Sequence, residues 1–302
     1  MTSVVLCVGA LSLDTIFRLD ALPTGPGKFL PIEAIEIAQG MATAQAATIV
    51  KLGGSARLWA SCGDDATGDR IVEQLTDAGI DLSALRRVPG ARSGFSSIFM
   101  DKTGERMIVP QYDPAIRAAP GTLPPMDDVA VVSVDVRWPA AAEMALRWAR
   151  ERGIPGLLDV EVAADDVLNR LVPLASHIVA SEAGALHLTG MSPDAAVAAI
   201  SARCGALVAV TAGERGVFWA GGHLPAPKVD AIDTLGAGDV FHGAFALAIT
   251  EKQELRQALR FASAAAALKC TRFGGAFAAP QRIEVEELLN QGHSADSACT
   301  GQ

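Results

Sequence analysis

Residues 233–239 read DTLGAGD and lie directly before an apolar segment with helical spacing. Gly236 and Gly238 permit a tight turn and a close approach of the backbone to a ligand. The N–H groups of a helix's first turn lack internal partners and favour an anion, and Asp239 would place a carboxylate in that turn. Backbone donors beside a carboxylate base are what phosphoryl transfer to an alcohol needs. A turn capped by an aspartate would explain GAGD alone, so the interpretation depends on the longer pattern.

Short apolar runs alternate with helical patterns along most of the chain. Several of the runs lack polar alternation, which indicates strands buried on both faces. This alternation predicts a parallel sheet covered on both sides by helices, and ligands of such sheets bind at the carboxyl ends of the strands. Helices are expected at 68–78 and 140–152, and the strand-like runs are residues 4–8, 57–60, 129–134, 156–160, 177–180 and 207–211.

Two segments, 15–37 and 93–108, break the alternation because they lack helical patterns. In the second segment an apolar run is followed by Lys-Thr-Gly at 102–104, which predicts a hairpin. The last residues are small and polar. We therefore expect residues 1–290 to form one α/β domain and residues 291–302 to form a disordered tail.

Composition excludes several classes of protein. A chain of 302 residues with 50% hydrophobic content can bury a large core. A net charge of −9 argues against nucleic acid or an anionic membrane as a partner. No apolar run reaches the ~18–20 residues of a membrane span, and the N-terminus lacks the cationic start of a signal peptide. The five cysteines are scattered and have no CxxC spacing, so we expect reduced thiols in a cytoplasmic protein.

The stretch DTLGAGDVFHGAF resembles the C-terminal signature of the ribokinase/PfkB carbohydrate kinase family. Further stretches follow in the family's order from near residue 4 to about residue 290: a first strand with Gly9 and Asp14, a turn at Gly40, LGG at 52–54, CGDDATG at 62–68, VTAGERG at 210–216 and FASAAAALKCTRFGG at 261–275. The resemblance implies a ribokinase-like fold, in which a mostly parallel central sheet is flanked by helices. It also implies that the two helix-poor segments form a small β-sheet lid over a sugar, through which a homodimer would form.

The resemblance also implies roles for individual residues. Asp239 would accept the proton of the attacking hydroxyl, although an acid in this place can also be a simple helix cap. Asp14 and Gly40 would bind the sugar, with a turn residue as the alternative for Asp14. The backbone donors for the γ-phosphate would be Gly236, Ala237 and Gly238.

The prediction of nucleotide-binding residues depends on less specific motifs. TAGERG on its own is more often a hairpin turn, and an alanine-rich helix can reflect close packing rather than room for adenine. No GxxxxGK[ST] motif and no GxGxxG after a strand is present, which argues against a P-loop kinase and a dinucleotide dehydrogenase. The residues implied to bind the nucleotide are Thr211, Gly213, Gly216, Gly236, Gly238, Ala262, Ala265 and Ala266.

Three positions depart from the family pattern. Gln39 replaces the first of two glycines before the sugar-side helix, and Ala44 replaces an asparagine. The usual Asn-x-x-Glu near residue 181 reads Ser-Glu-Ala-Gly here. The implied cofactors are ATP and Mg²⁺, and a monovalent cation is left open. Mg²⁺ keeps several waters and binds through substrate phosphates, so Glu182 or Asp159 could take the missing carboxylate's place.

Finer similarity points to the sulfofructose kinase branch, whose members phosphorylate the C1 hydroxyl of a ketose with a terminal sulfonate. In that comparison Lys28 and Arg137 match residues that grip the sulfonate, and an arginine fork with a mobile lysine suits a tetrahedral anion. Ordinary solvated or paired charges are the alternative. Pro110 stands where the branch has a polar residue, and Gln111 would have to substitute for it.

We therefore expect an ATP-dependent sugar kinase that acts on a ketose, with 6-deoxy-6-sulfofructose as the specific candidate. The nearest alternative is a kinase of a neutral sugar, such as a fructokinase, a ribokinase or a 2-keto-3-deoxygluconate kinase. A nucleoside kinase of the same fold is weaker, because only 5% of the residues are aromatic. An inactive sugar-binding regulator is the alternative of a different class.

Overall fold

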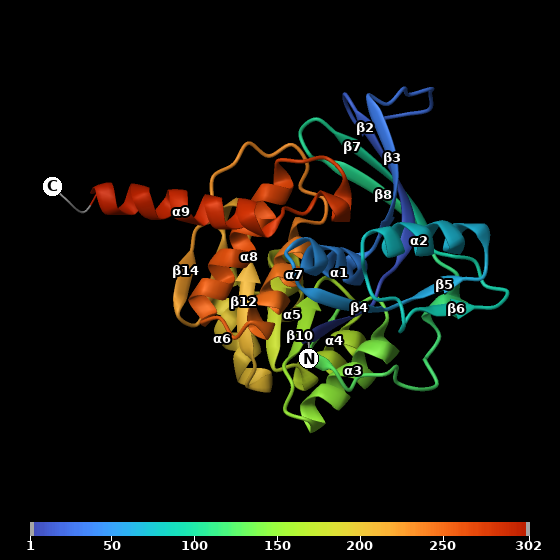
Figure 1. The fold of residues 1–302 in the computed structure, drawn as a ribbon. Coiled ribbons are helices and arrows are strands. Elements are labelled where there is room, and N and C mark those ends of the chain that lie inside the picture. Colours follow the sequence, from blue (N-terminus) through green and yellow to red (C-terminus); the bar gives the residue numbers. More distant parts are fainter. Residues whose placement is uncertain (1–2, 300–302) are drawn as a thin grey trace.

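The computed structural model describes residues 3–299 and contains a central, mostly parallel sheet (Figure 1). Over these residues the sheet has eight strands in the order β14-β13-β12-β11-β10-β9-β1-β4. The six neighbouring strands from β12 to β4 are parallel. At one edge β13 pairs antiparallel with β12, and β14 pairs antiparallel with β13. The strands are β1 (Val4–Val8), β4 (Ser55–Trp59), β9 (Val129–Val134), β10 (Gly156–Val160), β11 (His177–Ser181), β12 (Leu207–Thr211), β13 (Val217–Trp219) and β14 (Gly222–Leu224).

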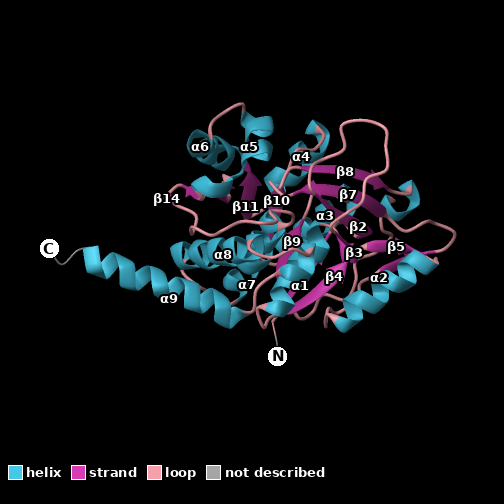
Figure 2. Ribbon diagram, turned by 90° about the horizontal axis from the view of Figure 1, so that it is seen from above, coloured by secondary structure: helices cyan, strands magenta, loops and turns pink. Residues whose placement is uncertain are grey.

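Helices cover both faces of this sheet, which confirms the predicted architecture (Figure 2). One layer contains α1 (Met41–Lys51), α7 (Ala237–Thr250) and α8 (Leu255–Cys270), and the other contains α3 (Pro139–Glu151), α4 (Asp165–Leu171), α5 (Glu182–Thr189) and α6 (Pro193–Cys204). Strands such as β1 carry apolar side chains toward both layers, and all five of its residues are buried. Burial on both faces is the physical reason for their unbroken apolar sequences.

A second sheet stands apart from the first, and its strands come mainly from the two helix-poor segments (Figure 1). Its action as a lid stays a prediction. Its strands are β2 (Ser12–Leu19), β3 (Glu33–Gln39), β7 (Phe95–Asp101) and β8 (Arg106–Gln111), and they pair in the order β3-β2-β7-β8. The predicted hairpin at 93–108 is β7 and β8, which pair antiparallel. Its turn carries the tip of the lid toward the loop before α7, where Arg106 Nη1 donates a hydrogen bond to Thr234 Oγ1 at 3.1 Å.

The remaining elements lie at the margins of the sheet. Helix α2 (Ala66–Asp77) is preceded by β5 (Ser61–Gly63), and β6 (Arg86–Val88) pairs with β5. Helix α9 (Arg282–Cys299) extends away from the body at the C-terminal end (Figure 1). Its described backbone covers most of the segment for which we predicted a disordered tail, and residues 300–302 lie outside the described residues. No helix within residues 3–299 is both long enough and apolar enough to cross a membrane.

Candidate active site

The glycine-rich turn forms the N-terminus of α7, as the sequence predicts. Gly236 caps the helix with φ 77°, a left-handed conformation that favours glycine. A Cβ added at Gly236 would lie 3.7 Å from Asp239 Oδ2, and one added at Gly238 would have no described atom within 4 Å beyond its chain neighbours and the backbone of its own helix. The carboxylate therefore borders the turn, and the space in front of Gly238 is open to a ligand. The amide of Ala237 donates to the Thr234 carbonyl at 3.2 Å.

The surroundings of Asp239 favour the protonated carboxyl. Loss of solvation raises the pKa of Asp239 well above its ordinary value, and repulsion from Asp159 raises it further. His242 acts in the opposite direction and lowers the pKa of Asp239. A carboxylate with a raised pKa is a stronger base than an exposed one, which suits a group that must remove a proton from a hydroxyl.

His242 connects the glycine-rich turn to the central sheet, a contact that we did not predict. Its Nδ1 lies 2.8 Å from the Gly238 carbonyl, and its Nε2 lies 3.1 Å from the Val179 carbonyl and 3.3 Å from Asp159 Oδ1. The His242 ring therefore lies between the Gly238 carbonyl of the turn and Asp159 of β10. Asp159 Oδ2 in turn accepts a hydrogen bond from Gln45 Nε2 at 3.0 Å.

On the sugar side, Asp14 is the residue with an unused acceptor. Only 5% of its surface is exposed, and its Oδ1 has no hydrogen-bond partner among the residues that the structure describes. Burial raises the pKa of Asp14, and hydrogen bonds from Ser12 and Ser96 oppose that shift. A buried carboxylate oxygen without a partner is costly, so a donor from a ligand would satisfy it. This fits the predicted contact with a sugar hydroxyl.

Asp135 is a further buried carboxylate that joins the first strand to the sugar-side helix. Its Oδ2 accepts hydrogen bonds from the amides of Ala10 at 2.7 Å and Ala42 at 3.1 Å. Gly9 is required by this packing, because an added Cβ would lie 2.1 Å from the Asp135 carboxylate. Gly40 is likewise required, because its Cβ would lie 2.3 Å from the Ala10 carbonyl oxygen. Both glycines therefore allow two backbone segments to pack closely beneath the sugar side.

Of the two cations predicted to grip an anion, Arg137 lines a pocket and Lys28 does not. A small pocket beside Gly9 is lined by Tyr112, Arg117 and Arg137 among other residues. Arg137 Nη1 donates to the Val162 carbonyl at 3.1 Å, and the Arg117 guanidinium lies 3.8 Å from the centre of the Tyr112 ring. Lys28 is exposed in the loop between β2 and β3, and it is not among the described residues that line this pocket. Arg117 is thus a second cation at this pocket, and the sequence analysis did not single it out.

The predicted nucleotide side is only partly open to a ligand. Ala262 and Ala265 have no exposed surface and lie in the core, whereas Ala266 is half-buried. Ala262 and Ala265 therefore pack in the core, which corrects their predicted contact with adenine. Thr211 ends β12 and donates through Oγ1 to the Ala180 carbonyl at 3.4 Å.

Two glycines follow β12 in the predicted phosphate loop. Gly213 has φ 56° and open space around it. Gly216 has φ 87°, and its added Cβ would lie 2.0 Å from the Leu224 carbonyl oxygen. Gly216 therefore has a packing role against the segment after β14, and Gly213 is the freer of the two to approach a phosphate.

The two carboxylates proposed for the metal have different surroundings. Both oxygens of Asp159 are engaged, by Gln45 and His242, so this side chain has little capacity left for an ion or its waters. Glu182 begins α5 at the end of β11, where it forms an ion pair with Arg215 and stays half-exposed. Within residues 3–299, no three His, Cys, Asp or Glu side chains form a group that could hold a metal ion by themselves. The residues fit a metal that is held mainly through substrate phosphates and water.

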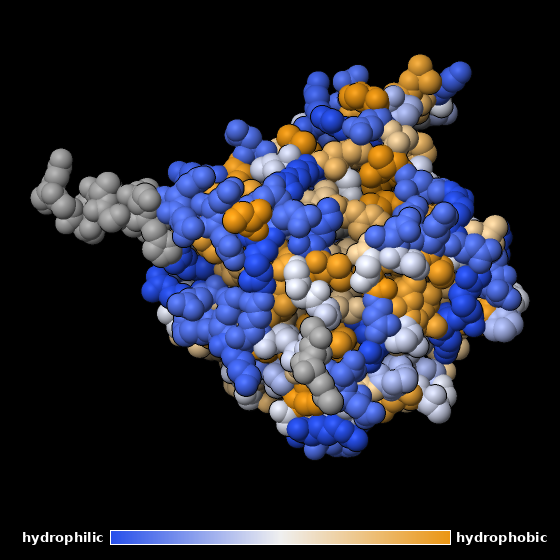
Figure 3. Space-filling view, viewed as in Figure 1, coloured by the Kyte–Doolittle hydropathy of each residue, from blue (hydrophilic) through white to orange (hydrophobic). Residues whose placement is uncertain are grey.

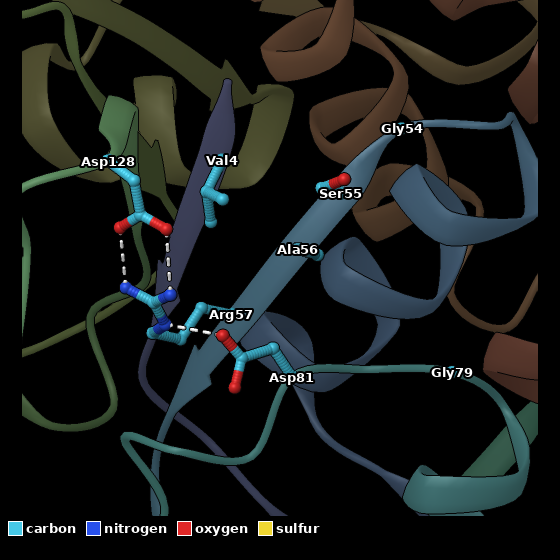
Figure 4. A pocket seen from close by; sticks show the side chains of 8 residues that line it. All are labelled: Val4, Gly54, Ser55, Ala56, Arg57, Gly79, Asp81 and Asp128. Carbon is cyan, nitrogen blue, oxygen red and sulfur yellow. Dashed lines mark hydrogen bonds and ion pairs between the residues drawn. The ribbon is translucent and has the colours of Figure 1, made fainter. Parts of the chain in front are cut away.

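A separate cavity of about 470 Å³ lies at the opposite, amino-terminal edge of β1 and β4 (Figure 4). Its polar wall is a clamp in which Arg57 Nε donates to Asp81 Oδ2 at 2.6 Å and Nη1 and Nη2 donate to both oxygens of Asp128 at 2.8 and 3.0 Å. Arg57 Nη1 also donates to the Pro125 carbonyl at 2.9 Å. Because these groups satisfy one another, the clamp joins two loops to β4 and is not part of the active site.

Comparisons with known proteins agree with this geometry. The model of a family described as pfkB family carbohydrate kinase matches residues 3–282. The ribokinase of Bacillus subtilis (strain 168) is 26% identical over 291 residues, which cover 94% of this chain and 98% of the relative. The present chain also shares its fold with the Arabidopsis thaliana ribokinase that was solved with ribose and ATP. The two are 26% identical with a TM-score of 0.80, and the match covers 96% of this chain and 99% of the other. A crystal structure from Agrobacterium tumefaciens, of a protein provisionally named a ribokinase, is 44% identical with a TM-score of 0.94 (97% and 99%).

Proposed function

Because the chain belongs to the pfkB family of carbohydrate kinases, we propose that its acceptor is a ketose with an anionic group at its far end. The family assignment makes the chain a phosphotransferase that uses ATP and Mg²⁺ and has an alcohol as its acceptor. The specific candidate is 6-deoxy-6-sulfofructose, phosphorylated at C1. The observation that carries this choice is the pocket beside Gly9, which Arg117 and Arg137 line together.

The arrangement of the site supports a direct transfer of the γ-phosphoryl group. Asp14 holds the sugar, and Asp239 takes the proton of the attacking hydroxyl. The backbone amides of Gly236, Ala237 and Gly238 face the γ-phosphate, and the Ala237 amide exchanges its bond to Thr234 for one to the phosphate. Each such donor contributes a factor of about 10²–10³ in rate. Closure of the lid over the sugar excludes water and limits ATP hydrolysis.

Mg²⁺ supplies positive charge that neutralises the phosphates during transfer. Of the chain's own residues, Glu182 is the carboxylate that we propose to orient the metal's waters, because it stands half-exposed at the carboxyl end of β11. On the nucleotide side we propose contacts from Thr211, Gly213 and Ala266.

The anionic end of the acceptor would lie against Arg117 and Arg137. An arginine fork binds a tetrahedral anion through paired donors, and the Tyr112 ring holds Arg117 in place. Lys28 could join them only through movement of the exposed loop between β2 and β3. We therefore propose Arg117 and Arg137 as the main contacts and Lys28 as a secondary one.

A neutral-sugar kinase is the second candidate, because the Bacillus subtilis and Arabidopsis thaliana relatives are ribokinases. The departures at Gln39 and Ala44 weigh against a ribose-type acceptor, since the asparagine expected at residue 44 is absent. The observation that favours a neutral sugar is Asp14, whose free oxygen would accept from any sugar hydroxyl.

We propose that the protein is a cytoplasmic homodimer joined through the lid. Apolar side chains are exposed on this small sheet and on the loop between β2 and β3, as the top of Figure 3 shows. They include Leu30 with 79%, Ile32 with 57% and Val109 with 54% of their surface exposed. A second lid would remove these side chains from water. Sedimentation of the purified protein would test this, since a monomer at micromolar concentration would contradict it.

The decisive experiment is ADP release with a panel of acceptors that includes sulfofructose, fructose 6-phosphate, fructose, ribose, 2-keto-3-deoxygluconate and adenosine. Asp239→Asn is the control for the chemical step. Arg117→Ala, Arg137→Ala and Lys28→Ala test the anionic end, and Arg92→Ala is a matched exposed arginine away from the lining of the pocket.

Selective activity with an anionic ketose, with KM raised in Arg117→Ala and Arg137→Ala but not in Arg92→Ala, would support the proposal. Equal or better activity with a neutral sugar would overturn the anionic acceptor and leave the kinase intact. The absence of ADP release with every acceptor would contradict the enzyme itself.

A further inference from the structure

A lysine is completely buried next to the loop that carries the catalytic turn. Lys269, near the end of α8, has no exposed surface, and neither has Asp233, the first residue of DTLGAGD. Lys269 Nζ lies 2.8 Å from Asp233 Oδ2 and donates to the Asp233 backbone carbonyl at 2.9 Å. Lys269 Nζ therefore contacts both an oxygen of the side chain and the carbonyl oxygen of Asp233, in a salt bridge that is completely buried.

The same carboxylate orders the loop on both sides. Asp233 Oδ1 accepts the amide hydrogen of Leu235 at 2.8 Å, directly before Gly236, and Oδ2 accepts that of Gly274 at 3.3 Å. The amide of Asp233 itself donates to the Cys270 carbonyl at 3.1 Å. A single buried ion pair thus joins the loop before α7 to the C-terminal end of α8 and to the segment that follows it.

A carboxylate and a backbone carbonyl are the oxygen ligands that a small cation takes in proteins. The resemblance to carbohydrate kinases left a monovalent cation open, and an anionic site beside the catalytic turn is a place where such an ion would act. Here the ammonium group occupies the oxygens. The residues of this chain therefore do not fit a separate ion at Asp233.

We propose that Lys269 is a tethered monovalent cation, which orders the DTLGAGD loop and makes catalysis independent of free K⁺ or Na⁺. Lys269 is a positioning residue, since it acts through Asp233 and Leu235 on the turn. The inference rests on the kinase activity proposed above, but it does not depend on which sugar is the acceptor. A purely structural ion pair would affect stability alone, so the test must measure cation dependence.

Two opposing effects act on the charge of Lys269. Burial lowers the pKa of Lys269, whereas the charge and hydrogen bond of Asp233 raise it. A buried carboxylate that loses its cation is left without compensation, which is strongly unfavourable. Removal of the Lys269 side chain should therefore leave a site at Asp233 that attracts a free cation of similar size.

The first measurement uses the wild-type enzyme with its best acceptor. ADP release is followed in tetramethylammonium salts and again with K⁺, Na⁺ or NH₄⁺ at equal ionic strength, because tetramethylammonium is too large for such a site. We expect the same kcat in all four salts. Activation of the wild-type enzyme by K⁺ or Na⁺ of about tenfold or more would overturn the proposal.

The second measurement uses Lys269→Ala, which leaves room for an ion. In tetramethylammonium salts its kcat should fall by about 100-fold, and K⁺, NH₄⁺ or ethylammonium should restore at least about tenfold of this loss. Lys269→Met fills the space without charge and should lose activity without rescue. Lys252→Met, an exposed lysine after α7, is the matched control and should behave as wild type.

Thermal unfolding gives a readout that does not need activity. K⁺ should raise the Tm of Lys269→Ala relative to tetramethylammonium, and it should not raise the Tm of the wild type. Equal Tm shifts in both proteins, or a Lys269→Ala variant with wild-type kcat, would contradict the proposal. If Lys269→Ala does not fold, the salt series on the wild type still decides the question. If no acceptor gives ADP, the kinase assignment fails, and the Tm series still tests the cation.

Discussion

The carboxylates in and around the candidate site differ in their hydrogen-bond and ion-pair partners. Asp239 borders open space, Asp159 is tied to Gln45 and His242, and Asp233 is paired with Lys269. Asp14 alone of these has a buried oxygen without a partner among the described residues. These different surroundings support different proposed roles for aspartates that look alike in the sequence: Asp239 as the base, Asp159 and Asp233 as structural supports, and Asp14 as a contact to the sugar.

Replacement of Asp14 by asparagine should weaken sugar binding. Asp14→Asn keeps the shape of the side chain but loses the charge that strengthens a bond from a sugar hydroxyl, so KM for the acceptor should rise by about 10- to 100-fold. KM for ATP should not change. Steady-state kinetics with each substrate varied in turn measures both. Asp20→Asn, at an exposed position directly after β2, is the control. An unchanged KM for the sugar would remove Asp14 from the binding site.

The raised pKa of Asp239 predicts where activity is lost in acid. Asp239 must be ionised to accept a proton, so kcat should fall as the pH falls through its raised pKa, at a higher pH than an ordinary carboxyl would give. Asp159→Asn removes a negative charge that raises this pKa and should move the acidic limb to lower pH. The measurement is kcat against pH at saturating substrates. An acidic limb that stays in place in Asp159→Asn would argue against this coupling.

The proposed closure of the site depends on a contact between two elements. The lid sheet reaches the catalytic loop through the β7–β8 hairpin, where Arg106 contacts Thr234. An added Cβ at Gly104 would lie 3.9 Å from Thr234 Oγ1, so the tip of the hairpin adjoins the loop. The small sheet and the loop before α7 are therefore in contact through residues that lie 128 positions apart in the chain.

Loss of the Arg106 contact should impair closure of the lid. A single exposed hydrogen bond is worth about 0.5–1.5 kcal/mol, so Arg106→Ala should lower kcat/KM for the sugar by about two- to tenfold. ATP hydrolysis without sugar should not fall, because the turn itself stays intact. Lys102→Ala, in the same hairpin turn, is the matched control. If both substitutions lowered kcat/KM equally, the effect would come from the loss of a positive charge at the hairpin and not from the hydrogen bond to Thr234.

At the scale of the whole molecule, the proposed catalytic site and a stabilising cluster lie at opposite ends of the parallel strands. The proposed base Asp239 lies near Asp159 and Asp135, at the carboxyl ends of β10 and β9, whereas the Arg57 clamp lies at the amino ends of β1 and β4 (Figure 4). Arg57→Ala should lower the free energy of unfolding by about 2–4 kcal/mol, because it breaks several charged hydrogen bonds of a nearly buried side chain. Chemical denaturation measures this loss. Kinetic constants should stay at wild-type values.

The exposed pair of Arg147 with Glu143 provides the comparison for that experiment. Arg147→Ala should cost about 0.5 kcal/mol or less, because an exposed ion pair is screened by water. If Arg57→Ala cost no more than Arg147→Ala, the clamp would not be a main support of the fold. A change in KM for either substrate would show instead that the two ends of the sheet are coupled.

Local patterns in the sequence determined the core of the fold and the catalytic turn. Strands such as Val4–Val8 are apolar throughout because both faces are covered, and the glycines of GAGD are required by local backbone geometry. Such features depend on neighbours in the chain and are therefore readable from it. The two lid segments were predictable for the same reason.

Only the tertiary structure decided which side chains face the site. Lys269 reads as an ordinary lysine near a helix end, and its partner lies 36 residues away. His242, Arg117 and the buried Ala262 and Ala265 likewise depend on which face of an element meets which neighbour. Charge pairing and burial arise from segments brought together by folding, and a one-dimensional pattern does not contain those distances.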